Sequence, residues 1–189
     1  SLDGQACVVV GQGSAGLFWD FILKGLNAEK IISIEPLSWR RELGRSYGVD
    51  ETIDVTGDAA VDAIRDLTGG IGADLVIEAV GSTPTLSQAF HLVRDEGRVV
   101  LFGLPESEDL VPFDYSQMFK SRADVFTVLG SQDEPGLTSY SEAARLIRKG
   151  EIDVDPIISH QVNISKIDRA FAIAGERVDG VVKVGITFE

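Results

Sequence analysis

The sequence predicts an α/β fold: a doubly wound, six-stranded parallel sheet followed by a C-terminal appendage of helices and a strand. Two observations predict it. Short apolar runs of strand length alternate with segments of helical periodicity, which is the pattern of βαβ units. The apolar runs also lack the polar alternation of a half-exposed strand, so both faces of the sheet are expected to be covered. The expected domains are residues 1–136, which hold the sheet, and residues 137–189, which form the appendage.

The first half of the sheet is expected from three apolar runs, at residues 6–10, 30–36 and 51–55. Between the first two runs, apolar residues recur at helical spacing over residues 17–26. A second helix is expected at residues 39–47, with Gly48 as its C-terminal stop. A third follows, capped by Asp58 and ending at two glycines.

The second half is expected from the runs at residues 73–80, 97–103 and 125–130, with helices at residues 85–93 and 115–120 between them. In a sheet of this kind the ligand crevice lies at the carboxyl ends of strands one and four. The sheet is then complete. The remaining residues predict a helix, an extended segment, a second helix and a last strand, at residues 140–149, 157–162, 166–174 and 181–186. This tail is expected to belong to a neighbouring unit.

A glycine-rich turn joins the first strand to the first helix at residues 11–17 (GQGSAGL). Gly11 is expected to allow the tight turn out of the strand, Gly13 to leave room for a pyrophosphate, and Gly16 to let the helix pack closely. The free N–H groups and the positive end of the helix dipole would hold the anion without a lysine. The strand-turn-helix context makes this G-x-G-x-x-G a dinucleotide-binding signal.

An acid follows at the end of the second strand. Glu35 lies 19 positions after Gly16, close to the spacing of about 20 expected for a carboxylate that accepts a hydrogen bond from a ribose 2′-OH. A 2′-phosphate at this place would meet like charge. The expected cofactor is therefore NAD rather than NADP, although a glycine turn beside a surface glutamate would share part of the pattern.

Composition limits the partners. Seventeen Lys and Arg against thirty Asp and Glu give a net charge of −13, which argues against nucleic acid or an anionic membrane. The single cysteine, Cys7, lies in the first expected strand and excludes a disulfide within the chain. No run resembles a signal peptide or a membrane span. We expect a cytoplasmic protein, and an opening so close to the first strand favours the loss of an N-terminal segment.

Four segments occur in order along nearly the whole chain: residues 11–16 (GQGSAG), 69–81 (GGIGADLVIEAVG), 97–103 (GRVVLFG) and 180–184 (GVVKV). Together they resemble the medium-chain dehydrogenase/reductases, and among these the zinc-type alcohol dehydrogenase branch. The resemblance implies a Rossmann fold that binds NAD and is inserted in a catalytic domain. Zinc would lie only in that catalytic domain, which is missing here. Neither His91 nor His160 has a partner at metal-ligand spacing, so this chain is expected to contribute no metal ligand and no catalytic residue.

The resemblance also implies the cofactor contacts. The pyrophosphate would be held at the glycine turn, by Gly11, Gly13, Ser14, Ala15, Gly16 and Leu17, and the adenosine ribose by Glu35 and Arg40. The adenine side of the crevice would be lined by Val80 and Gly81, and the nicotinamide side by Phe102, Gly103, Leu104, Val128 and Leu129. Ordinary strand-end core is the alternative for the apolar members. Glu78 is interpreted as a structural carboxylate. Such an enzyme would transfer a hydride between an alcohol and NAD, and this chain alone is expected to be inactive.

Other classes share part of the pattern. The zinc-free, quinone-reductase-like branch of the family usually prefers NADP, against which Glu35 argues. Short-chain dehydrogenases need a Tyr-x-x-x-Lys pair, and Tyr115 and Lys120 are one residue too far apart. A methyltransferase would leave the third glycine unexplained. A nucleotide-sensing module would have no reason to carry the tail.

The last expected strand predicts self-association. Residues 125–129 are apolar and carry no lysine or proline to discourage pairing at an open sheet edge. In the family this strand often pairs with its own copy across a two-fold axis. The expected assembly is a homodimer through strand six.

Overall fold

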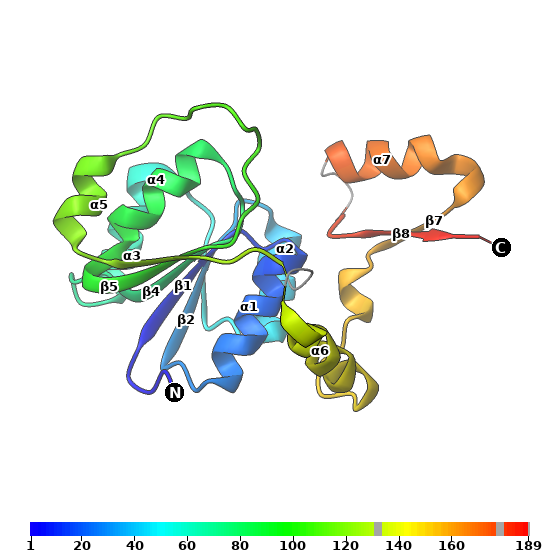
Figure 1. The fold of residues 1–189 in the computed structure, drawn as a ribbon, viewed down its shortest axis with the longest axis horizontal. Coiled ribbons are helices and arrows are strands. Elements are labelled where there is room, and N and C mark those ends of the chain that lie inside the picture. The colour runs from blue at the N-terminus through cyan, green and yellow to red at the C-terminus, as the bar shows by residue number, and fades with distance from the viewer. Residues whose placement is uncertain (131–133, 177–179, 189) are drawn as a thin grey trace. The chain divides into compact units, whose positions relative to one another are not determined.

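The computed structural model describes residues 1–130, 134–176 and 180–188. Residues 131–133, in the first predicted domain, and residues 177–179 and 189, in the second, lie outside the described residues. The chain divides into two compact units, Ser1–Val128 and Leu129–Glu189 (Figure 1). Each unit is described by itself.

The first unit is built on one six-stranded sheet. Its strands are β1 (Ala6–Val10), β2 (Lys30–Ile34), β3 (Glu51–Ile53), β4 (Ala73–Glu78), β5 (Val93–Leu101) and β6 (Asp124–Thr127). They run in the order β3-β2-β1-β4-β5-β6, and every neighbouring pair is parallel. The prediction of a doubly wound sheet is confirmed. The crossover point lies between β1 and β4, so ligands of such a sheet are received at the carboxyl ends of these two strands.

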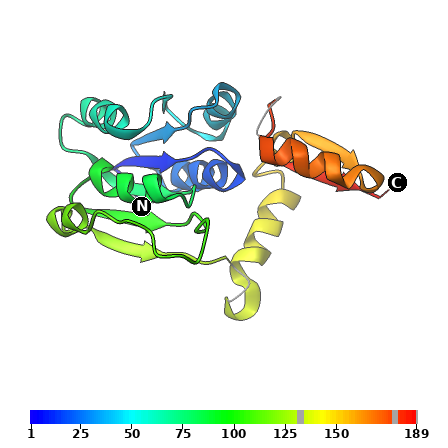
Figure 2. The same ribbon diagram turned by 90° about the horizontal axis from the view of Figure 1, so that it is seen from above.

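Helices cover both faces of this sheet (Figures 1 and 2). They are α1 (Ser14–Gly25), α2 (Ser38–Tyr47), α3 (Gly57–Leu67), α4 (Thr83–Leu92) and α5 (Tyr115–Ser121). One core cluster packs α3 and α4 against the sheet through Ile64 and Phe90, and the other packs α1 through Trp19 and Leu23. The strands are apolar on both faces because each face is buried.

The core of the sheet is centred on β1, in which Cys7, Val8 and Val9 have no exposed surface. Cys7 is a free thiol. Burial raises its pKa to about 12, and the nearby Asp74 carboxylate acts in the same direction. The thiol is therefore a small buried side chain without nucleophilic character.

Two details of the first unit differ from the sequence prediction. Thr56, not Asp58, occupies the N-cap position of α3, and no side chain caps this helix; Asp58 lies in its first turn. The fifth strand begins at Val93 rather than Gly97, through a register irregularity against β4 between Ala73 and Leu75. The polar residues between Val93 and Arg98 interrupt the apolar run, so periodicity alone does not reveal this earlier start.

The second unit contains α6 (Thr138–Arg148), α7 (Ile167–Glu176) and a two-stranded parallel sheet of β7 (His160–Asn163) and β8 (Val184–Thr187). Among the described residues of this unit are also the short 3₁₀ turns η2 (Pro135–Leu137), η3 (Asp155–Ile157) and η4 (Ile164–Lys166). The predicted extended segment at residues 157–162 therefore starts as a turn. The last strand begins at Val184 rather than Val181.

Candidate functional site

The glycine turn leaves β1 at its carboxyl end and begins α1. Gly11 has φ +90°, in the left-handed region that glycine tolerates best. Gly16 lies directly on this turn, because a Cβ at Gly16 would overlap the carbonyl oxygen of Gly11. The turn and the first turn of α1 therefore pack backbone against backbone, which explains two of the three glycines without any ligand.

Gly13 is different. It is the N-cap of α1 with φ −74° and ψ −176°, a conformation open to any residue. A Cβ built there would find a single described atom within contact range, Arg40 Nη1 at 4.0 Å. Neither backbone geometry nor packing within the described chain requires glycine here. The absent side chain leaves open space in front of the helix end.

The N-terminus of α1 has no side-chain cap and no acidic residue in its first turn. Leu17 N–H donates to Gly13 O at 3.1 Å, which starts the helical ladder, so the preceding N–H groups have no acceptor within the helix. Ser14 and Ala15 are half-buried at this end, whereas Leu17 is fully buried behind it. Oriented donors and the helix dipole together favour an anion here.

Glu35 follows β2 and is only 5% exposed. Its Oε2 accepts a hydrogen bond from Gln12 N–H at 2.9 Å, and its Oε1 accepts one from Leu37 N–H at 3.0 Å. The carboxylate thus ties the glycine turn to the start of α2, a role that sequence spacing did not reveal. An ionised carboxylate has about four acceptor positions, so two remain for a ribose hydroxyl.

Two arginines of α2 lie around this acid. The Arg40 guanidinium lies beside the open space at Gly13. Arg41 instead supports the backbone, since its Nη1 donates to Glu35 O at 2.8 Å and to Pro36 O at 2.6 Å. These two arginines therefore have different roles: Arg40 borders the candidate site, and Arg41 stabilises the backbone that follows β2.

A second carboxylate organises the opposite wall. Glu78 ends β4, is 1% exposed, and accepts hydrogen bonds at Oε1 from Val80 N–H and Gly81 N–H, both at 2.9 Å. The Gly81 and Gly103 backbones touch, because a Cβ on either one would overlap the other segment. Glu78 thus acts as a structural carboxylate, in agreement with its interpretation from the sequence.

The remaining predicted contacts within the first unit fall at or near the same end of the sheet. Val80 is next to the turn, since a Cβ at Gly11 would meet its Cγ2. Phe102 packs edge-on against Trp19 of α1, with ring centroids 5.6 Å apart. Leu104 is exposed, and Val128 N–H donates to Leu101 O beyond the end of β6. Leu129 begins the second unit. That these residues contact a cofactor stays a prediction.

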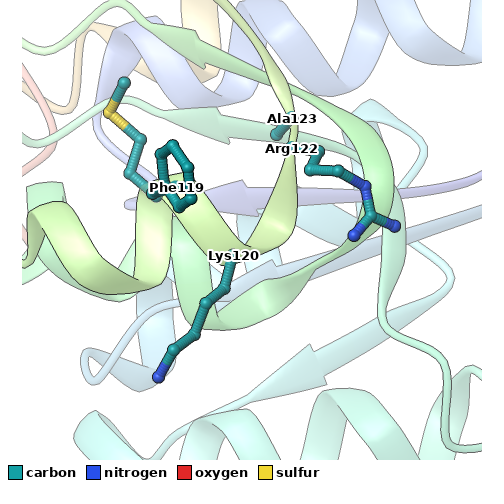
Figure 3. Close-up of a pocket in the computed structure, with 5 residues that line it drawn as sticks. Phe119, Lys120, Arg122 and Ala123 are labelled. Carbon is teal, nitrogen blue, oxygen red and sulfur yellow. The ribbon is translucent and has the colours of Figure 1, made fainter.

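A surface hollow lies elsewhere, at the end of α5 and the start of β6 (Figure 3). Its lining residues are Met118, Phe119, Lys120, Arg122 and Ala123. Arg122 already forms ion pairs with Asp95 and Glu96 at 3.2 and 3.3 Å. The hollow borders the amino end of the edge strand, whereas the glycine turn lies at the carboxyl end of β1, so the hollow is not part of the candidate site.

No group of three or more His, Cys, Asp and Glu side chains that would hold a metal occurs among the described residues. His91 pairs with Asp114 at 3.1 Å, and His160 Nδ1 lies 3.1 Å from Ser159 Oγ. The described helices also include none with the length and apolar character needed to cross a membrane.

The sheet order, the helices on both faces and the glycine turn at the crossover point define a doubly wound α/β domain of the Rossmann type. The chain belongs to the zinc-binding dehydrogenase family, whose model matches residues 16–149. It is 29% identical to L-threonine 3-dehydrogenase of Pyrococcus horikoshii and 30% identical to that of Pyrococcus abyssi, in each case over 91% of this chain and 49% of the relative. This chain thus spans about half the length of these relatives.

Solved structures show the same likeness. Alcohol dehydrogenase TADH from Thermus sp. ATN1 superimposes with a TM-score of 0.83 at 26% identity, over 99% of this chain and 52% of that one. A putative alcohol dehydrogenase from Thermotoga maritima gives a TM-score of 0.78, also at 26% identity, over 100% of this chain and 47% of that one.

Proposed function

We propose that this chain is the NAD-binding part of an alcohol dehydrogenase-like oxidoreductase that transfers a hydride between an alcohol and NAD. The observation that carries the proposal is the open space at Gly13, in front of an uncapped helix N-terminus. Nothing within the described chain requires a glycine there, whereas a bound pyrophosphate does. The family and the likeness to dehydrogenases support the same reading.

The residues present fit a nicotinamide dinucleotide. The N–H groups of the first turn of α1 would hold the pyrophosphate, with Arg40 beside it. The Glu35 carboxylate would accept the ribose hydroxyls and disfavour a 2′-phosphate. The rest of the bound dinucleotide would lie against Val80, Gly81, Gly103 and Leu104, which would exclude water from it. When bound, the nicotinamide supplies the hydride acceptor or donor.

The described residues do not fit a catalytic zinc. Substrate and any hydride-transfer metal would therefore be held by parts of the protein outside these 189 residues, and the second unit would be a segment returning toward that catalytic domain. The chain alone would bind the dinucleotide without turnover.

Calorimetric titration of the chain with NADH and with NADPH tests this proposal. We expect NADH to bind about tenfold more tightly, or ~1.4 kcal/mol, because a 2′-phosphate would face Glu35. Equal or tighter binding of NADPH would favour the zinc-free, quinone-reductase-like alternative, with Arg40 as the phosphate partner.

The variant Gly13→Val tests whether the glycine turn binds the nucleotide. Its Cβ would enter the pyrophosphate space with only the mobile end of a side chain, Arg40 Nη1 at 4.0 Å, within contact range, so the variant is expected to fold and not to bind NADH. Circular dichroism checks the fold and calorimetry the binding. A folded variant with normal NADH affinity would remove the turn from the site.

A further inference from the structure

The side chain of Gln12, between the first two glycines of the turn, is completely buried. Its amide lies close to two helices that pack against each other, α1 and α2. A Cβ at Gly16 of α1 would lie 3.4 Å from Gln12 Nε2, and a Cβ at Gly44 of α2 would overlap Gln12 Oε1. Glutamine is mostly an exposed residue, so its burial between two helices calls for an explanation.

Gly44 is the partner of this side chain on α2. It is buried inside the helix, and its φ is not positive, so backbone geometry does not require glycine there. Alanine would favour the helix more than glycine does. The atoms nearest to a Cβ at Gly44 are Gln12 Oε1, which it would overlap, and then Gln12 Cδ and Val49 Cγ2, both at 3.4 Å. The Gln12 amide therefore occupies the place of a side chain at Gly44.

Shape, rather than hydrogen bonding, describes the contact with α2. Gln12 Oε1 has no hydrogen-bond donor among the described residues. Gln12 Nε2 makes a long hydrogen bond of 3.4 Å to Gly11 O, within the turn itself. On the α1 side the amide lowers the pKa of the buried Asp20 carboxyl group, against the larger rise caused by burial. The amide thus contacts α2 by packing and works as a spacer between the two helices.

The backbone of the same residue holds the ribose acid. Gln12 N–H donates to Glu35 Oε2 at 2.9 Å, and Glu35 Oε1 accepts from the N–H of Leu37, the N-cap of α2. The Gln12 side chain meets α2 again at Gly44, about two turns further along the helix. Gln12 therefore contacts the acid and the helix behind it at two separate points, which fixes both relative to the glycine turn.

We propose that Gln12 is a positioning residue for nucleotide selection: its buried amide spaces α2 from α1, and thereby holds the Glu35 carboxylate where it accepts the ribose hydroxyls of a dinucleotide whose pyrophosphate lies at the turn. This inference rests on the proposed function. Without the spacer, α2 and Glu35 shift relative to the turn. NADH then loses its ribose hydrogen bonds, whereas NADPH, whose 2′-oxygen carries a phosphate, loses little. A residue that only stabilised the fold would weaken the binding of both nucleotides by the same factor.

Calorimetric titration of Gln12 variants with NADH and NADPH tests the spacer. At about pH 7, below the raised pKa of Asp20, this acid has the same charge in each form. Gln12→Ala should raise the NADH dissociation constant roughly tenfold and the NADPH constant little, so the preference narrows toward equality. Gln12→Met keeps the length and volume without the amide and should retain both affinity and preference. Gln161→Ala, at an exposed glutamine of the second unit, is the control and should follow the wild type.

A double variant tests whether Gly44 acts through Gln12. Gly44→Ala forces the amide out of its place and should weaken NADH binding roughly tenfold. In Gln12→Ala/Gly44→Ala the new methyl group meets no amide, and Val49 Cγ2 at 3.4 Å becomes its nearest neighbour among these contacts. The loss should therefore stay at about tenfold, instead of the roughly hundredfold loss of two independent effects. Gly25→Ala, on α1 with no atom within 4 Å of the new Cβ, is the matched control.

The ratio of the two dissociation constants does not depend on the folded fraction, so a destabilised variant still decides the question. Equal weakening of NADH and NADPH by Gln12→Ala overturns the proposal, as does a loss of preference in Gln12→Met or a hundredfold loss in the double variant. A wild-type preference that every Gln12 variant keeps refutes the positioning role alone. A wild-type chain that binds neither nucleotide, or both equally, refutes the proposed function and the positioning role with it.

Discussion

At the scale of single residues, the site is made by carboxylates at strand ends and by glycines with unequal tasks. Glu35 follows a strand and accepts backbone N–H groups of Gln12 and Leu37, whereas Glu78 ends a strand and accepts those of Val80 and Gly81. Gly16 is required by close backbone packing, whereas Gly13 faces open space. One motif therefore contains a glycine that backbone packing requires and a glycine that packing does not require.

Alanine substitution separates these tasks within one helix. Gly16→Ala would push a Cβ into the Gly11 carbonyl and is expected to lower the free energy of unfolding by about 3 kcal/mol. Gly25→Ala, in the last turn of α1 with no atom within 4 Å of the new Cβ, should raise it by roughly 0.5–1 kcal/mol. Urea unfolding of both variants measures the difference, and equal stabilities would contradict the close approach at Gly16.

Glu35→Ser is expected to have two effects. The variant loses the acceptor for Gln12 N–H and Leu37 N–H, so the free energy of unfolding should fall by roughly 2 kcal/mol or more. It also removes the charge that opposes a 2′-phosphate, so the NADH preference over NADPH should narrow toward equality. Calorimetric titration with both nucleotides measures the preference. A variant that keeps the full preference would show that Glu35 is structural only.

At the scale of elements, α1 carries a buried acid, Asp20, whose protonation makes the stability of the fold depend on pH. Burial raises the pKa of Asp20 in the folded chain to about 8 from its ordinary value of 3.8, so the folded state holds this proton more tightly than the unfolded state. Its contribution is complete below pH 3.8 and is lost as pH rises toward 8.

Asp20→Asn should accordingly gain stability relative to the wild type as pH rises through that window. The difference in free energy of unfolding is expected to change by at most about 1.4 kcal/mol per pH unit. Guanidinium unfolding of both proteins at several pH values measures it. Parallel pH profiles would place the native pKa of Asp20 near its ordinary value.

Much of this arrangement of helices and strands could be predicted from the sequence. The features that could not be predicted have physical reasons. The strands were predictable because parallel strands buried on both faces leave continuous apolar runs, as in residues 6–10. The turn was predictable because its glycines stand between such a run and a helical period. The burial of Asp20 was not predicted, although it lies three residues after Leu17 on the buried side of α1. An acid in an amphipathic helix is normally assigned to the solvent-exposed face. The link from Glu35 to Gln12 N–H depends on tertiary contact that spacing does not encode.

At the scale of the whole molecule, β6 is an open edge of the first sheet, and all four of its residues are exposed. Val125 and Phe126 present apolar side chains there, 36% and 51% exposed. Val128 N–H points toward β5, since it donates to Leu101 O. The N–H of Thr127, one residue earlier, therefore points away from β5 toward the open side.

We predict that this edge pairs with a second copy of the chain to form a homodimer. Thr127→Pro would remove an outward donor without breaking the β5–β6 ladder, and should shift the protein toward monomer. Thr127→Val keeps the donor and is the matched control. Light scattering after size exclusion gives the mass of each form, and a wild-type chain that is monomeric at high micromolar concentration would refute the prediction.

The buried thiol in β1 also gives the chain its own reporter of opening. Cys7 is the single cysteine in 189 residues, it has no exposed surface, and β1 pairs with β2 on one side and β4 on the other. An alkylating reagent can reach it only after these strands separate, so the rate of labelling at one sulfur, followed by mass spectrometry, measures how often the sheet opens. A nucleotide held at the end of the same strand should slow that rate in proportion to its occupancy, which turns a residue with no chemical role into a label-based assay for the ligand.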